Sequence, residues 1–246
     1  MPNFFIEKSN ITNSTVTITS DDAHHIARSL RMAVGDLITV SDNFGVQYSA
    51  RLTKIRDDIC EAKIEDKRIG FGEAPVSVTL FMGYPKADKL ELIVQKATEL
   101  GASEIIPFES ARCIKRPSQD KMDKINARLC RIATEAAKQC SRSKIPIVAP
   151  VIKFPELVRR INDFDLALFC YEGASKENSC KRVLEAASNN VHTIAVIVGC
   201  EGGFDNAEAL ALTEAGADAV SLGERIMRCE TAPDFILSAI SYKFEM

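Results

Sequence analysis

The sequence holds few of the residue patterns from which metal sites are built. It has three histidines, and its eight cysteines never come closer together than ten residues. There is therefore no Cys-x-x-Cys pair and no Cys/His cluster, which excludes the usual structural zinc sites. Several cysteines lie inside apolar runs, as Cys170 does in Leu166–Cys170, which is typical of reduced thiols in the cytoplasm. We expect a cytoplasmic protein without a metal.

The sequence also lacks a long apolar run. No stretch approaches the ~20 residues that span a bilayer, and Met1–Phe5 has no basic segment followed by an apolar one, as a secretion signal would. With 246 residues, 46% apolar and 26% charged, the composition is that of a globular chain with one large or two small domains. Neither a membrane span nor export is expected.

The usual phosphate-binding glycine motifs, G-x-G-x-x-G and G-x-x-x-x-G-K-[ST], are missing where glycine does cluster. Instead, the apolar run Thr193–Val198 leads into Gly199-Cys200-Glu201-Gly202-Gly203, a pattern that predicts a buried strand ending in a tight loop. Glu201 stands where a phosphate would need positive potential. The loop therefore suits a ligand with cationic groups, such as S-adenosylmethionine; the alternative is a turn with glycine only for steric reasons.

A second glycine-led loop follows about twenty residues later. After the short strand pattern Asp218–Leu222 comes Gly223 to Ala232, which contains Arg225, Arg228 and Glu230. Two such loops at neighbouring strand ends are typical of the two halves of one pocket in an open α/β sheet. The alternative is that both arginines are solvated surface charges.

The hydrophobic period changes along the chain. Residues 3–70 predict short strands with one helix at 21–32, and residues 66–75 predict a linker. From residue 76, strands at 76–82, 104–108, 165–170, 193–198 and 218–222 alternate with helices. We predict an α/β protein with two domains. Residues 1–70 would form a small β-barrel of an RNA-binding kind, and residues 71–246 a mostly parallel sheet covered on both faces.

Basic residues concentrate in one part of the chain. Between Arg112 and Lys144 there are ten basic residues and three acids, and the helical spacing of these basic residues places many of them in one stripe beside an apolar stripe. Such a stripe favours binding to a phosphate backbone, although a solvated helix face is the alternative. The residues predicted to bind RNA are Arg28, Arg31, Lys121, Lys124, Arg128, Arg131 and Arg142.

Five sequence motifs, in order along nearly the whole chain, resemble those of the RsmE family of RNA methyltransferases. They are His24-His25 with Leu30-Arg31 and Gly35-Asp36, then Gln95–Gly101 (QKATELG), Glu135–Arg142 (EAAKQCSR), Gly199–Gly203 (GCEGG) and Leu222–Ala232 (LGERIMRCETA). This family methylates N3 of a uridine in small-subunit (16S) ribosomal RNA and belongs to the SPOUT class.

The resemblance implies a PUA-like N-terminal domain and a C-terminal α/β domain with a deep trefoil knot. It also implies a homodimer that acts on the small ribosomal subunit, with S-adenosylmethionine held by the two glycine loops and by the loop after Cys170. The implied cofactor-binding residues are Tyr171, Gly199, Glu201, Gly202, Gly203, Leu222, Gly223, Ile226, Met227 and Arg228.

For catalysis we expect Arg228, supported by Arg225, to donate hydrogen bonds to the uracil oxygens as charge develops there. Glu230 is the nearest candidate base, or else it orients an arginine. For Glu201 we expect a role in orienting the backbone or binding the cofactor amine.

The chain departs from the family pattern at four positions. The family usually has proline at Cys200, leucine at Met227, threonine at Cys229 and arginine at Asn3. We expect Cys200 to loosen its loop, because proline would have fixed φ, and Asn3 to remove one RNA contact.

Three rival functions remain. The chain could methylate another RNA, such as transfer RNA or large-subunit (23S) RNA, or it could be a non-catalytic RNA-binding relative. A nicotinamide-dependent oxidoreductase fits poorly, because the first strand of the α/β part ends in Gly83-Tyr84-Pro85-Lys86 and not in G-x-G-x-x-G.

Overall fold

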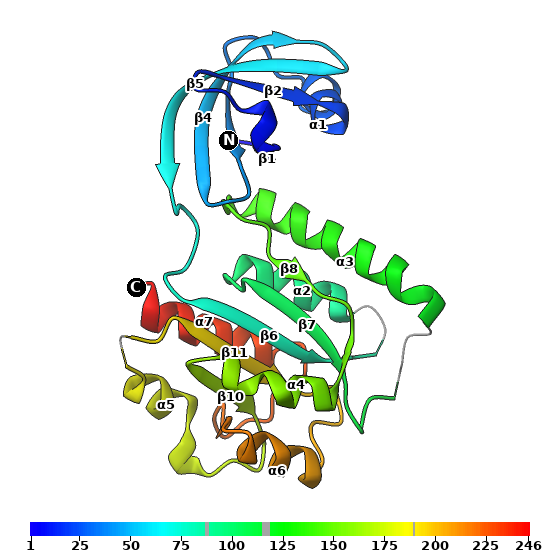
Figure 1. Ribbon diagram of the computed structural model, residues 1–246, viewed down its shortest axis with the longest axis vertical. Helices are drawn as coiled ribbons and strands as arrows, with labels where there is room; N and C mark the ends of the chain where they lie inside the picture. Colours follow the sequence, from blue (N-terminus) through cyan, green and yellow to red (C-terminus); the bar gives the residue numbers. More distant parts are fainter. Residues whose placement is uncertain (87–88, 115–118, 189) are drawn as a thin grey trace. The chain divides into compact units, whose positions relative to one another are not determined.

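The computed structural model describes residues 1–86, 89–114, 119–188 and 190–246 (Figure 1). The chain divides into two compact units. The N-terminal unit consists of Met1–Glu73 together with Ala137–Ile145, and the C-terminal unit consists of Ala74–Ala136 together with Pro146–Met246. No sequence pattern had signalled that a short segment from the middle of the chain would join the N-terminal unit.

The N-terminal unit is built on one five-stranded sheet in the order β1-β3-β4-β5-β2. Only β1 and β3 run parallel, and β1 and β2 are not paired with each other among the described residues, so the ladder is open there. Alternate side chains of the strands, with Ala23 and Ile26, form one buried core. The elements are β1 (Asn3–Phe5), η1 (Lys8–Asn10), β2 (Thr15–Thr19), α1 (Ser20–His24), η2 (His25–Ser29), β3 (Leu37–Ser41), β4 (Val46–Ile55) and β5 (Ile59–Ile69).

Two boundaries in this unit differ from the prediction. The helix expected at 21–32 ends at Ser29 with a π-helical turn, and Arg31 adopts a left-handed backbone with φ 49°, which a continuing helix does not allow. Residues 66–69, expected in the linker, continue β5, because the hairpin partner Val46–Ser49 extends far enough to pair with them.

The segment Ala137–Ile145 is fixed to the N-terminal unit by buried polar groups. Arg142, whose side chain is 4% exposed, forms an ion pair with Glu73, with Nη2 to Oε2 at 2.7 Å. Glu73 Oε1 also accepts hydrogen bonds from the backbone nitrogens of Ser143 and Lys144 at 3.0 and 2.9 Å. On the other side, Asn3 Nδ2 donates to the Arg142 carbonyl at 3.0 Å. Asn3 and Arg142 therefore stabilise this unit.

The C-terminal unit contains a seven-stranded sheet in the order β12-β10-β11-β6-β7-β8, with β9 pairing to β7. Every pair in this sheet is parallel, which confirms the predicted parallel α/β architecture. The strands are β6 (Ser77–Gly83), β7 (Glu104–Glu109), β8 (Ile147–Val148), β9 (Ile152–Lys153), β10 (Leu166–Cys170), β11 (Thr193–Val198) and β12 (Asp218–Val220).

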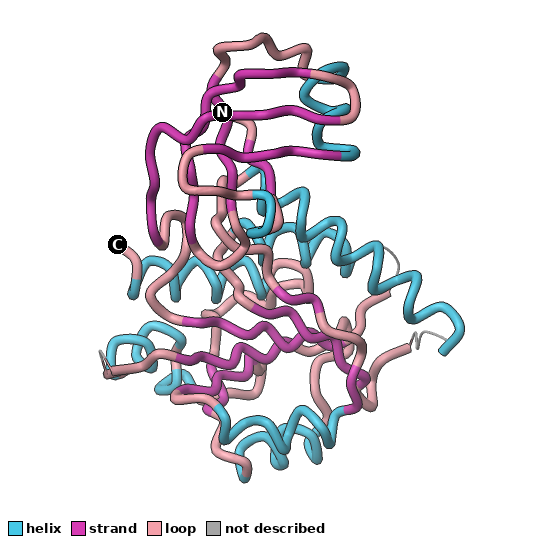
Figure 2. Tube along the Cα trace, turned by 45° about the horizontal axis from the view of Figure 1, so that its top comes forward, coloured by secondary structure: helices cyan, strands magenta, loops and turns pink. Residues whose placement is uncertain are grey.

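Helices cover both faces of this sheet (Figure 2). Phe81, Ile106 and Phe169 pack with Leu157 and Leu212 on one face, whereas α7 packs against α2 and β11. The helices are α2 (Lys89–Glu99), α3 (Gln119–Gln139), α4 (Phe154–Arg160), η3 (Ile161–Asp163), η4 (Lys176–Asn178), α5 (Cys180–Ala186), α6 (Asn206–Glu214) and α7 (Ala232–Phe244).

Local signals set several of these elements. Asp205 and Glu208 form a capping box at the start of α6, and Gly101 adopts φ 87° after α2, as a C′ glycine does. The strand expected at 218–222 ends at Val220, so Leu222 lies in the following loop. Among the described residues, no helix is both long and apolar enough to cross a membrane.

We predict that Glu73→Gln lowers the stability of the N-terminal unit by about 3–5 kcal/mol, because it leaves the buried guanidinium of Arg142 without its carboxylate. The readout is hydrogen exchange of β3 and β4 amides, which reports the free energy of opening of this unit alone.

The control is Asp66→Asn, the same chemical change in a pair with Arg68 in which both side chains are more than 60% exposed. It should change the free energy of opening by less than about 1 kcal/mol. Equal effects of the two variants would contradict the structural role of the Glu73–Arg142 pair.

Candidate functional site

A cavity of about 850 Å³ opens at the carboxyl edge of the parallel sheet of the C-terminal unit. The strands β12, β10, β11 and β6 are adjacent and parallel, so the loops that follow the first three meet at this edge. These loops supply most of the wall: 170–174 after β10, 199–204 after β11 and 220–229 after β12, joined by Lys89 at the start of α2. The two predicted glycine loops therefore do border one cavity.

The loop 199–203 rests directly on the end of β6. A Cβ atom on Gly83 would overlap the backbone nitrogen of Cys200, so this approach requires glycine at position 83. The carboxylate of Glu201 also accepts a hydrogen bond from the backbone nitrogen of Lys86 at 3.0 Å. Backbone packing and this carboxylate hold the loop in place.

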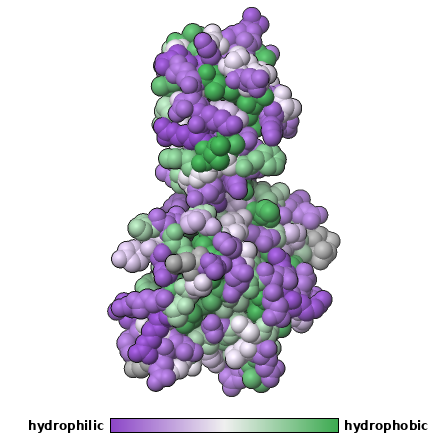
Figure 3. Space-filling model, turned by 60° about the vertical axis from the view of Figure 1, so that its left-hand side comes forward, coloured by the Kyte–Doolittle hydropathy of each residue, from purple (hydrophilic) through white to green (hydrophobic). Residues whose placement is uncertain are grey.

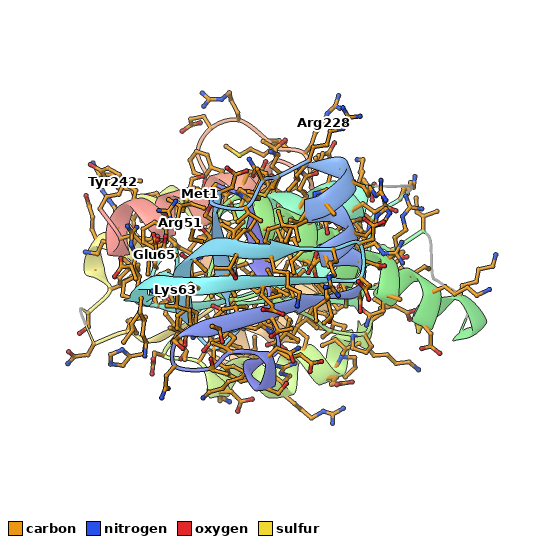
Figure 4. The ribbon with its side chains drawn as sticks, turned by 90° about the horizontal axis from the view of Figure 1, so that it is seen from above. Met1, Arg51, Lys63, Glu65, Arg228 and Tyr242 are labelled. Atoms are coloured by element: carbon orange, nitrogen blue, oxygen red, sulfur yellow. The ribbon has the colours of Figure 1, made fainter. Side chains whose placement is uncertain are left out.

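The loop after β12 is more exposed. Gly223 adopts φ 118°, a conformation that favours glycine. Arg225 and Arg228 both border the cavity, both are exposed, and neither makes a side-chain hydrogen bond or ion pair within the described part of the chain. Figure 4 shows the Arg228 side chain projecting outward from this loop. Two unpaired guanidinium groups are therefore available to a ligand at the rim of the cavity.

Lys89 joins the two glycine loops. Its Nζ lies 2.9 Å from Glu230 Oε2 and 3.3 Å from Glu201 Oε1, and 3.9 Å from the sulfur of Cys229. The three charged side chains are between 17% and 33% exposed. One ammonium group, from a residue more than a hundred positions earlier in the chain, thus bridges the carboxylates of the two glycine loops.

This bridge shifts the protonation of its members. The hydrogen bond from Lys89 lowers the pKa of Glu230, and the hydrogen bond to Glu230 raises the pKa of Lys89. Burial opposes ionisation of Glu201, yet hydrogen bonds from its own backbone nitrogen, from Lys86 and from Lys89 lower its pKa. Burial and the neighbouring Glu230 raise the pKa of Cys229 to about 12. The site therefore carries two carboxylates and a neutral thiol at neutral pH.

All but one of the predicted cofactor-binding residues lie together at the cavity. Nine of them border the cavity: Tyr171, Gly199, Glu201, Gly203, Leu222, Gly223, Ile226, Met227 and Arg228. Gly202 is outside its lining and contacts Arg112, whose Nη1 donates to the Gly202 carbonyl at 2.8 Å. Sequence reasoning missed Lys89, because nothing local marks a lysine that pairs across 141 residues.

The residues predicted to bind RNA separate into three groups. Arg31, Lys121, Lys124 and Arg131 are exposed. Arg28 and Arg128 are also exposed but pair with Asp57 and Glu91. Arg142 is buried in its ion pair with Glu73 and is not part of an exposed basic surface, which corrects its expected contact with phosphate. Lys115 and Arg116, counted in the basic stretch, lie outside the described residues.

Chemically, the cavity suits an organic ligand that carries both apolar and cationic groups. Its volume is within the range of small-molecule sites, the strand-end residues Cys170, Val198 and Val220 line it, and Glu172 and Glu201 border it. In the part of the chain that the structure describes, no three His, Cys, Asp or Glu side chains are placed to hold a metal ion. The site offers positioning and hydrogen-bond donors.

Comparison with known proteins matches both parts of the chain to RNA methyltransferase families. A family described as RNA methyltransferase domain matches residues 72–241, and one described as RNA methyltransferase PUA domain matches residues 18–65. Ribosomal RNA small subunit methyltransferase E of Bacillus subtilis is 37% identical, covering 100% of this chain and 98% of that protein. The protein of that name from Synechocystis is 34% identical, covering 96% and 75%.

A solved structure is also similar over its full length. It is a ribosomal RNA small subunit methyltransferase E from Neisseria gonorrhoeae, bound to S-adenosyl methionine. It is 30% identical with a TM-score of 0.86, covering 99% of this chain and 98% of that one. The resemblance of the five sequence motifs to the RsmE family is thereby confirmed.

We predict that Lys89→Met raises the pKa of Glu230 toward its ordinary value near 4.5, because the ammonium that favours the carboxylate is removed. Carboxyl-carbon NMR titration measures this directly. In the wild type, the lowered pKa of Glu230 stabilises the fold above pH ~4.5, and this contribution is lost as the pH falls through the folded-state pKa.

Lys181→Met is the matched control, since Lys181 forms an exposed pair with Glu185 on α5. It should leave the titration of Glu230 unchanged. An unshifted Glu230 in the Lys89 variant would mean that the bridge does not form in solution.

Proposed function

The chain belongs to the RNA methyltransferase family that includes ribosomal RNA small subunit methyltransferase E, and we propose that it transfers a methyl group from S-adenosylmethionine to N3 of a uridine in 16S ribosomal RNA. One observation carries this proposal: both glycine loops, with Arg225 and Arg228 at the rim, border the same cavity at the sheet edge. That arrangement can hold a cofactor beside a base.

The cavity residues fit S-adenosylmethionine. The acids Glu201 and Glu172 complement its sulfonium and amine, and the backbone groups of 199–203 and 222–227 suit its adenosyl part. Tyr171 would border its third side, and Gly202 would contribute by shaping the turn. When bound, S-adenosylmethionine supplies an electrophilic methyl group. The protein then has to position the base, exclude water and favour loss of the N3 proton.

Arg228, supported by Arg225, would donate hydrogen bonds to the uracil oxygens as negative charge develops on them, because it is exposed at the rim without a described protein partner. Glu230 is a poorer proton acceptor than the sequence suggested, since Lys89 lowers its pKa. We propose that Glu230 instead anchors the loop 222–231 through Lys89.

RNA binding would use the exposed basic residues. On α3, Lys121, Lys124 and Arg131 are exposed at helical spacing, which suits contact with successive phosphates. In the N-terminal unit, which carries the PUA match, Arg31 is exposed and Arg28 pairs with Asp57. Figure 4 shows Arg51 beside Glu65 on the same sheet, so that arginine is neutralised.

We also propose that the C-terminal unit is threaded as a trefoil knot and that two copies of the chain form a homodimer in the cytoplasm. An apolar face supports the dimer. Phe235 and Tyr242 of α7 are 40% and 75% exposed and border a groove with Leu184 of α5. Figure 3, turned toward this side, shows hydrophobic side chains among hydrophilic ones. Exposed apolar surface of this kind is typical of an interface.

The test is transfer of tritiated methyl groups from S-adenosylmethionine to small ribosomal subunits from a strain that lacks the homologous enzyme, followed by nucleotide mapping. We expect one methylated uridine per subunit. Arg228→Ala should lower turnover by ~10²–10³, as loss of one oxyanion donor does. Arg159→Ala, an exposed arginine on α4 away from the cavity, is the control.

The outcomes separate the rivals. Label in transfer RNA or large subunits alone would favour another substrate, and cofactor binding without transfer to any RNA would favour a non-catalytic relative. An Arg228→Ala variant with wild-type turnover at saturating cofactor would remove the proposed role of that residue.

For the RNA surface, we predict that Lys124→Gln combined with Arg131→Gln flattens the salt dependence of binding to deproteinised 16S ribosomal RNA. Each lost phosphate contact should reduce the slope of log K against log[salt] by about 0.7–0.9. Fluorescence anisotropy across salt concentrations gives the slope. The matched control, Lys153→Gln with Arg159→Gln, removes the same charge elsewhere in the same unit; if both variants gave equal slopes, α3 would not be the contact surface.

A further inference from the structure

Two cysteines and a serine meet behind the glycine loop 199–203. Cys200 belongs to that loop, and Ser110 and Cys113 belong to the turn after β7. Ser110 Oγ lies 3.2 Å from the sulfur of Cys113 and 3.8 Å from the sulfur of Cys200. Cys113 is 7% and Cys200 4% exposed. The proposed methyl transfer uses neither thiol, so this cluster is unexplained by it.

The surrounding groups shift the pKa values of the two thiols in opposite directions. The neighbouring Cys113 thiol, the Gly202 N–H and Ser110 lower the pKa of Cys200, although burial opposes this. The neighbouring Cys200 and burial raise the pKa of Cys113. Thiolates are the nucleophilic form of cysteine. Cys200 is therefore the nucleophile of the pair and Cys113 the proton donor.

Only one of the two cysteines lines the cavity. Cys200 borders the cavity of the glycine loops, whereas Cys113 does not. An oxidant in the cavity therefore meets the wall at Cys200, and Ser110, which contacts both sulfurs, places Cys113 beside it as the second thiol.

We propose that Cys113 and Cys200 form a thiol-oxidation site at which hydrogen peroxide converts the pair into a disulfide. The Cys200 thiolate attacks one peroxide oxygen, the O–O bond breaks, and the leaving hydroxide takes up the Cys113 proton to form water. The Cys113 sulfur then attacks the resulting Cys200 sulfenic acid, the S–O bond breaks, and the leaving hydroxide takes up the proton that Cys200 had lost. In sum, two thiols and one peroxide give one disulfide and two waters.

The bond changes the cavity wall. A disulfide brings its two sulfur atoms to the distance of a covalent bond, so the sulfurs of Cys113 and Cys200, which both lie beside Ser110 Oγ, have to move together. The backbone of Cys200 already packs against Gly83 without spare room, so formation of the bond has to displace the loop 199–203 or the turn that carries Cys113. On the proposed function, oxidation should weaken cofactor binding; formation of the bond itself does not depend on that function.

The first experiment titrates the reduced full-length protein with hydrogen peroxide, counts free thiols, and identifies cross-linked tryptic peptides by mass spectrometry. We expect loss of two thiols and a Cys113–Cys200 link that is absent from Cys113→Ser and Cys200→Ser. Circular dichroism confirms that both variants fold.

The chain contains its own control pair. Cys170 and Cys180 are neighbours whose pKa values are both raised by burial, that of Cys180 to about 11. They should stay reduced while Cys113 and Cys200 react. Failure of the Cys113–Cys200 link to form, or equal oxidation of the Cys170–Cys180 pair, would overturn the proposal.

The second experiment measures binding of S-adenosylhomocysteine by calorimetry to reduced, oxidised and re-reduced protein. Oxidation should weaken binding by about tenfold, since small displacements at a binding loop have large effects, and dithiothreitol should restore it. Reduced Cys113→Ser should bind as the wild type does.

The two experiments fail in different ways. A link that forms in a protein that never binds the ligand would leave the oxidation site and remove the proposed function. Ligand binding without any link would do the reverse. A link that forms without changing the affinity would overturn the proposed effect on the cavity.

Discussion

The structure of the site depends on the adjacency of four parallel strands, β12, β10, β11 and β6. Their carboxyl ends lie at one edge, so segments far apart in sequence are brought together there before any side chain contributes. The loop 199–203 then packs on Gly83 of β6, and Lys89 joins it to the loop of Glu230. The order of the strands determines where the cavity lies, and the ion pairs of Lys89 hold its walls in place.

This dependence explains what could be predicted from the sequence. The strand Thr193–Val198 was predicted correctly because its signal, an apolar run that ends in a glycine loop, is local, and the RNA methyltransferase family was recognised from five sequence motifs. The glycine loops border one cavity because each follows a strand end. Lys89 was missed since its partners lie over a hundred residues away, and the segment Ala137–Ile145 was placed wrongly for the same reason: its partners Asn3 and Glu73 come from the N-terminal part.

Charge patterning shows the same limit. The stretch from Arg112 to Lys144 has a large excess of basic residues, but acids from elsewhere in the fold neutralise several of them. Arg128 pairs with Glu91, Lys138 with Asp22, and Arg142 with Glu73. A helical stripe counted along the sequence therefore overstates the exposed positive charge. What remains for a phosphate backbone is the subset on α3 whose side chains face solvent.

The cysteines of the cavity wall show how far residue type alone can mislead. Cys200 and Cys229 border the same cavity, yet burial and the neighbouring Glu230 raise the pKa of Cys229, whereas the neighbouring Cys113 thiol lowers that of Cys200. Both stand where the resemblance to the RsmE family led us to expect a residue without a thiol. The two loops are held by Gly83, Gly223 and the Lys89 bridge and not by the cysteine side chains. The backbone of these loops therefore carries two cysteines of the same cavity wall whose thiols differ in acidity.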